Sequence, residues 1–112
     1  MSISHEEFID NKRKQVVEIA TSMLSGAIEY LDGSIELSSL SLNLDLPADD
    51  PDFMVFTIIA SDIDHLPVRK SRPYWSKDAL NKHAAEIAEA TEWAKGISRA
   101  NCESIITRFG KS

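Results

Sequence analysis

The fold class of this chain depends most on residues 49–64, which read DDPDFMVFTIIASDID. Asp50, Pro51 and Asp52 are typical of a helix start, because an acidic N-cap precedes proline at the first helical position and a carboxylate follows in the first turn. Apolar side chains then recur at three- and four-residue intervals, at Phe53, Phe56, Ile59, Ala60 and Ile63. Since the segment is apolar nearly all round, we predict a central, buried helix. A strand is the alternative, because the segment is rich in β-branched residues: Val55, Thr57, Ile58 and Ile59.

The preceding segment, residues 27–46, is also open between helix and strand. An Asp-Gly-Ser sequence at 32–34 is a turn or helix-start signal, and leucines alternate strictly from position 40 to position 46, which favours a strand. An isolated strand, however, would have no partner elsewhere in this chain. We therefore predict a helix over about 33–41, opened by Asp32 or Ser34, followed by an extended arm to Leu46.

Two longer helices are predicted on either side. Ser4 and Glu7 have the spacing of a capping box, and apolar residues at helical spacing continue towards Gly26, which predicts a helix over about 5–25. Ser76 begins a last helix that ends at Gly110, and Gly96 either bends or divides it. The predicted fold is all-α: one domain over residues 1–112, a bundle of about four helices with a long C-terminal helix.

The composition excludes several functional classes. The chain has 112 residues with 18 Asp and Glu against 12 Lys and Arg, and the net charge of −6 argues against a nucleic-acid binder. No apolar run approaches the roughly 20 residues that span a bilayer. The N-terminus lacks the features of a secretory signal, and a single cysteine, Cys102, suits a reducing compartment, so we predict a cytoplasmic protein. A basic and aromatic cluster is a weaker alternative as a phosphate or nucleic-acid patch: Arg69, Lys70, Arg72, Tyr74 and Trp75.

The acidic residues are concentrated in the middle of the chain. No Lys or Arg lies between Lys14 and Arg69, and this interval contains ten carboxylates, whereas the two flanks together carry +4 (12 basic minus 8 acidic residues). Such segregation favours an acidic face that recruits a basic protein. We predict that this face consists of Glu29, Glu36, Asp45, Asp49, Asp50, Asp52, Asp62 and Asp64. The alternative is a solvated surface on which caps and turns happen to be acidic.

Candidate chemistry is limited to Asp62, Asp64 and His65, which could bind a divalent cation or share a proton. Their spacing matches neither a calcium loop nor a zinc helix motif. We therefore expect no catalytic residue, no metal and no cofactor, and we assign His65 to the polar end of the central helix, where it would donate to exposed carbonyls. Cys102 is expected to be a buried structural thiol.

Several elements together resemble a small bacterial domain family of uncharacterised function: Asp32-Gly33-Ser34-Ile35, Asp50-Pro51-Asp52-Phe53 with Phe56, Asp62-Ile63-Asp64-His65-Leu66-Pro67, and Trp75-Ser76. The resemblance implies an all-α fold, bacterial origin and a long last helix bearing a cysteine, where Cys102 stands. It implies no catalytic residues.

Small acidic proteins of this kind are often immunity proteins, which is an analogy of fold and charge. We therefore predict a toxin-neutralising immunity protein that binds a cognate basic toxin domain, of the nuclease type, as a monomer or weak dimer. The alternatives are a small housekeeping or regulatory interaction domain without a toxin partner, and an enzyme centred on Asp62, Asp64 and His65.

Overall fold

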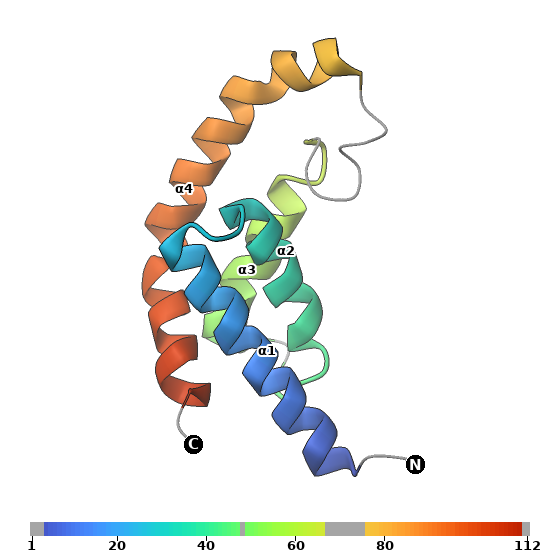
Figure 1. Cartoon of the computed structure of the whole chain (residues 1–112), viewed down its shortest axis with the longest axis vertical. Coiled ribbons are helices and arrows are strands. Elements are labelled where there is room, and N and C mark those ends of the chain that lie inside the picture. The colour runs from blue at the N-terminus through green and yellow to red at the C-terminus, as the bar shows by residue number, and fades with distance from the viewer. Residues whose placement is uncertain (1–3, 48, 67–75, 111–112) are drawn as a thin grey trace.

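The computed structural model describes residues 4–47, 49–66 and 76–110, and four helices make up most of this part of the chain (Figure 1). They are α1 (His5–Ser25), α2 (Tyr30–Ser41), α3 (Pro51–Asp62) and α4 (Lys77–Phe109). The all-α prediction and the long C-terminal helix are thereby confirmed, and the helix alternative holds for residues 53–62. The basic and aromatic cluster at 69–75 lies outside the described residues.

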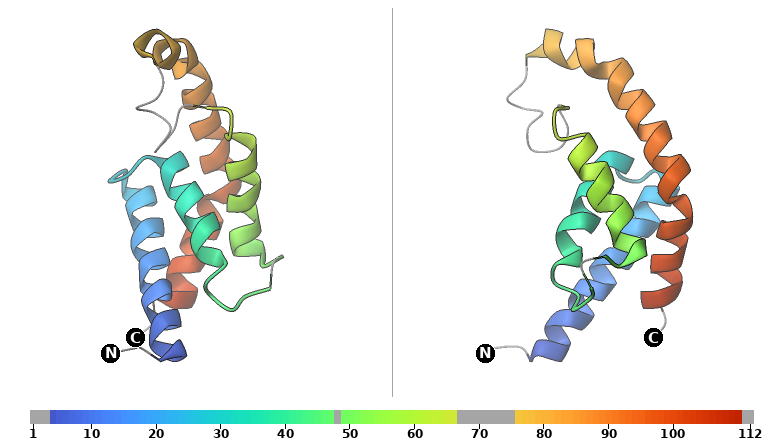
Figure 2. Two further views of the ribbon diagram at one scale, coloured as in Figure 1. Left: turned by 90° about the vertical axis from the view of Figure 1, so that its right-hand side faces the viewer. Right: turned by 180° about the vertical axis from the view of Figure 1, so that it is seen from behind.

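The two long helices, α1 and α4, pack against each other, and the antiparallel pair α2 and α3 completes the bundle (Figures 1 and 2). Both α2 and α4 contact all three other helices, whereas α3 packs mainly against these two. The prediction that residues 53–63 form the buried, central helix was wrong in this respect. Phe53, Phe56 and Ile59 of α3 are buried, but Met54 and Ile58 are exposed on its outer side.

Side-chain caps begin three of the helices as their sequences predict. Ser4 Oγ accepts from the backbone N–H of Glu7 at 3.1 Å, and Ser76 Oγ accepts from that of Ala79 at 3.1 Å. Asp50 Oδ1 accepts from the N–H of Asp52 at 3.1 Å. Each cap satisfies a donor that has no partner within the helix.

The start of α2 differs from its prediction by three residues. The helix begins at Tyr30 after an extended Glu29. Ser34 is not a cap, because it is buried in the second turn and donates its hydroxyl to the carbonyl of Tyr30 at 2.9 Å. Gly33 lies within α2 at its closest approach to α1, where a Cβ atom would overlap the Met23 side chain. The Asp-Gly-Ser sequence therefore reflects close helix packing and not a helix start.

The leucines that follow α2 do not form the predicted extended arm. The backbone N–H groups of Leu42, Asn43 and Leu44 each bond to the carbonyl three residues earlier, and Asp45 takes a left-handed φ of 56°. This series of tight turns leaves Leu42 86% exposed and buries Leu44. A series of turns, and not a strand, therefore places Leu44 in the core and Leu42 in solvent.

The last helix is continuous through Gly96, so that glycine does not divide it. Its 33 residues would span about 50 Å at 1.5 Å per residue, comparable to the longest dimension of the molecule, 47 Å. Its first half projects beyond the end of α3 (Figure 2), and its buried residues begin only at Ala94. Within the described ranges, no helix is both long and apolar enough to cross a membrane.

Candidate functional site

The eight carboxylates predicted to form one face are distributed over two ends of the bundle. The Oγ atoms of Ser38 and Thr57 lie 3.1 Å apart midway along the antiparallel α2–α3 pair. The start of α2 and the end of α3 therefore share one end, and the α2–α3 connection lies at the other (Figure 1). We call these the upper and lower ends. The upper end carries Glu29, Asp62 and Asp64, the lower end carries Asp45, Asp49, Asp50 and Asp52, and Glu36 lies between them.

At the lower end, two of these carboxylates form an internal ion-pair cluster with Arg108. The guanidinium contacts Asp50 through a two-pronged pair of bonds at 3.0 and 3.1 Å, and it donates to Asp52 at 2.8 Å. The carboxylates are almost inaccessible, with side-chain exposures of 10% and 14%, while Arg108 retains 35%. Asp50 and Asp52 therefore join the start of α3 to the end of α4, which limits what they can offer a partner.

The donors around Asp52 determine its protonation. Burial alone would raise its pKa, but hydrogen bonds from Ser104 at 2.7 Å, Arg108 and Asn101 outweigh that effect and hold the pKa below its ordinary value. The same carboxylates raise the pKa of Arg108. Sequence reasoning missed Arg108, because its only local signal is a basic residue in the last turn of a helix.

The other lower-end carboxylates lie at the surface. Asp45 Oδ2 is 2.6 Å from Nε2 of His5, and both side chains are largely exposed. Asp49 is exposed before the start of α3. Surface pairs of this kind contribute little to stability.

At the upper end, the end of α3 and the projecting half of α4 enclose a hollow of about 280 Å³. We call it the upper hollow, and its lining combines carboxylates, an indole and apolar side chains: Asp62, Ile63, His65, Leu66, Glu86, Glu89, Ala90 and Trp93. Glu86 and Glu89 were not among the predicted face residues, because they belong to the C-terminal flank of the sequence. The fold brings them next to the acidic middle of the chain.

Two histidines orient Glu86 at this site. His83 Nδ1 lies 3.0 Å from Glu86 Oε1, and His65 Nε2 lies 3.3 Å from Glu86 Oε2. Hydrogen bonds from His83 and then His65 lower the pKa of the Glu86 carboxyl. His65 thus pairs with a side chain of α4, whereas the sequence suggested the carbonyls at the end of α3. Among the described residues, no group of three or more His, Cys, Asp and Glu side chains is arranged to hold a metal ion.

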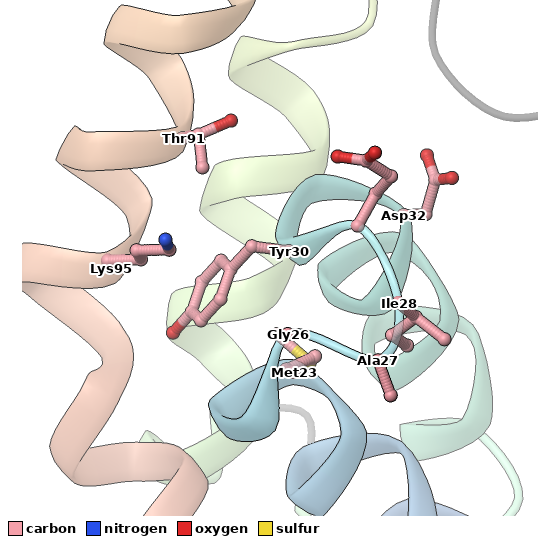
Figure 3. Close-up of a pocket in the computed structure, with 9 residues that line it drawn as sticks. Met23, Gly26, Ala27, Ile28, Tyr30, Asp32, Thr91 and Lys95 are labelled. Carbon is pink, nitrogen blue, oxygen red and sulfur yellow. The ribbon is translucent and has the colours of Figure 1, made fainter.

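A second concavity, of about 510 Å³, lies between the α1–α2 turn and α4 (Figure 3). Its lining has mixed charge, since Glu29 and Asp32 come from the start of α2 and Lys95 from α4. Tyr30 extends across it towards α4 (Figure 3). A lysine therefore lies beside the two carboxylates here, whereas the upper hollow is lined by three carboxylates and, among the described residues, by no Lys or Arg.

The Tyr30 hydroxyl takes part in a buried chain of hydrogen bonds. Ser98 Oγ donates to the carbonyl of Ala94 at 2.6 Å, so the Tyr30 hydroxyl, 2.5 Å from Ser98 Oγ, must be the donor to it. The Cys102 thiol, 3.6 Å away, can in turn donate to the Tyr30 oxygen. Burial raises the pKa of both Tyr30 and Cys102, so neither group ionises readily. Cys102 is fully buried, which confirms the prediction of a buried thiol.

Comparison with protein-family profiles, curated proteins and solved structures found no match to this chain. The resemblance to a bacterial domain family therefore stays a prediction.

Proposed function

We propose that this protein is a toxin-neutralising immunity protein whose upper end binds a basic toxin domain of the nuclease type. The observation that carries the proposal is the convergence of exposed carboxylates from α3 and α4 at that end. Asp62 ends α3 and Asp64 follows it, while Glu86 and Glu89 lie on α4. Glu29 precedes α2 at the same end of the bundle but lines the concavity of mixed charge. The residues that we propose to bind the partner are therefore those at one end of the fold, and not all those of the continuous acidic stretch of sequence.

The proposed mechanism is charge complementarity. A nuclease groove is rich in Lys and Arg because it must hold phosphates, and an array of carboxylates can occupy the same positions. Exposed carboxylates chiefly accelerate encounter with such a partner, and buried contacts at the centre then slow dissociation. In this proposal the protein acts in the cytoplasm by binding and occlusion, and it performs no catalysis of its own.

The ion-pair cluster at the lower end contributes indirectly. Asp50, Asp52 and Arg108 fix the start of α3 against the end of α4. In this proposal, the cluster and the packing of α3 against α4 hold the carboxylates of Asp62 and Glu89 in place before a partner arrives. Such preorganisation lowers the entropy cost of association.

Co-expression with the product of the adjacent gene tests the proposal. That product should be toxic alone and harmless together with this protein. Asp62→Asn combined with Glu89→Gln should reduce protection, whereas Glu18→Gln combined with Asp49→Asn removes the same charge from other exposed positions and should protect normally. A neighbouring product that is harmless alone, or toxic regardless of this protein, would contradict the proposal. That result would favour a housekeeping or regulatory interaction domain.

A further inference from the structure

Half-exposed apolar side chains lie on the outer side of the line along which α3 and α4 pack, which we call the α3–α4 seam. Ile58 of α3 is 49% exposed, and Trp93 and Ile97 of α4 are 37% and 42% exposed. Hydrogen bonds from Asn101 and Ser104 to Asp52 fix the antiparallel register of the two helices at the lower end.

This register places the apolar residues along one seam. Asp62 and Trp93 line the same hollow at the upper end. One helical turn further down, Ile58 lies on the face of Asp62 and Ile97 on the face of Trp93, because residues four apart share a face. The three apolar residues therefore form a short strip that runs from the upper hollow towards the middle of the bundle.

At its upper end, the strip is surrounded mainly by negatively charged side chains. Asp62 and Glu89 line the hollow beside Trp93, and Glu86, which also lines it, already accepts hydrogen bonds from His65 and His83. An indole face attracts a cation, and a guanidinium can stack on it while it bonds to carboxylates. The combination therefore suits a Lys or Arg side chain flanked by apolar residues.

We propose that the α3–α4 seam is a docking groove for a basic amphipathic segment of a partner protein. Its apolar residues would cover Ile58, Trp93 and Ile97, and one Lys or Arg would enter the upper hollow. This inference rests on the proposed function for the basic character of the partner, and it adds where and how that partner binds. A large aromatic residue at the centre of such a contact is the type of side chain that supplies most of the binding free energy.

Charge disfavours two other occupants of the groove. A second copy of this chain would bring another −6 of charge to the same surface. An anionic membrane surface would face the carboxylates around Trp93 and be repelled by them. Both occupants are nevertheless outcomes that the following experiment detects.

The test uses the full chain and a synthetic peptide of about 18 residues, long enough to form a helix, with leucines on one face and arginines on the other. Two-dimensional NMR spectra should show shifts centred on the Trp93 indole and on the methyl groups of Ile58 and Ile97. A matched peptide with glutamate in place of arginine should produce no such shifts. Trp93→Ala and, separately, Ile97→Ser should weaken binding at least tenfold, because each removes an apolar contact from the strip.

Leu42→Ala is the matched control, because Leu42 is an exposed apolar residue far from the seam. It should bind the arginine peptide like the wild type. The inference is overturned if the shifts map to the lower end, if the glutamate peptide binds equally well, or if the protein alone forms a dimer that Trp93→Ala dissolves. Binding to anionic vesicles that Trp93→Ala abolishes would overturn it too.

The two proposals fail separately. Peptide binding at the seam without protection in co-expression would contradict only the immunity function. Protection that survives Trp93→Ala and Ile97→Ser would contradict only the docking groove.

Discussion

Arg108→Ala should be among the most destabilising substitutions that leave the hydrophobic core untouched. Arg108 makes three charge-assisted hydrogen bonds to Asp50 and Asp52, whose side chains are only 10% and 14% exposed. Removal of the guanidinium leaves both carboxylates desolvated. Asp52 keeps its donors Ser104 and Asn101, whereas Asp50 keeps the backbone N–H of Asp52.

The expected loss in free energy of unfolding is about 2–4 kcal/mol. Breaking a fully buried pair costs about 3–5 kcal/mol, and the lower figure allows for water that reaches the 35% exposed Arg108. For a domain of this size, such a loss corresponds to a fall in Tm of roughly 10–20 °C.

The loss should also depend on pH. The pKa of Asp52 is lower in the folded protein than its unfolded value of about 3.9, so its stabilisation is present above that value and disappears as pH falls through the folded pKa. The difference in free energy of unfolding between wild type and Arg108→Ala should therefore be largest at neutral pH and decrease below about pH 4.

Urea unfolding at pH 7 and at pH 3 measures both effects. Arg99→Ala is the matched control on the same helix, because Arg99 is 74% exposed and lies 3.9 Å from Glu103, and it should cost less than about 0.5 kcal/mol. Arg108→Lys should recover only part of the stability, since an ammonium cannot form the two-pronged contact. A loss below about 0.5 kcal/mol for Arg108→Ala, or one equal at both pH values, would show that the ion pairs do not stabilise the fold in this way.

Three further predictions concern the interior. Gly33→Ala should lower the free energy of unfolding by about 1–3 kcal/mol in urea unfolding, because the added methyl group overlaps Met23. In a Met23→Ala background the same change should be neutral or stabilising. Equal losses in both backgrounds would exclude the steric cause. Tyr30→Phe should cost about 1 kcal/mol in thermal unfolding through loss of the bond to Ser98, and an unchanged Tm would contradict this. The Cys102 thiol should react with Ellman's reagent only as fast as the protein opens, and rapid reaction of the native protein would show that the thiol is accessible.

Local signals in the sequence were sufficient for most of the helix boundaries. The caps at Ser4, Asp50 and Ser76 and the glycine at 26 define helix ends through contacts with residues two to four positions away, so a sequence pattern can reveal them. The start of α2 could not be found in this way. The Asp-Gly-Ser sequence that suggested a later start instead reflects the packing of Gly33 against Met23 of α1, and propensity does not report such a contact.

The sequence predicted that the candidate site is acidic, but it did not predict which residues come together there. The acidic interval supplied Asp62 and Asp64, but Glu86 lies in a flank that is basic on balance, and only the antiparallel register of α3 and α4 brings it to His65. Conversely, Asp50 and Asp52 looked available for a partner and are bound to Arg108, 58 and 56 positions away. Contacts over such sequence separations leave no periodic signal.

If the acidic upper end recruits a basic protein, the association rate with the adjacent gene's product should depend strongly on ionic strength. The rate should fall at least about tenfold as salt rises from low to above physiological concentration. The Asp62→Asn and Glu89→Gln double variant should lower the rate at low salt and flatten this dependence. A rate that ignores ionic strength, or one that the double variant leaves unchanged, would contradict the claim.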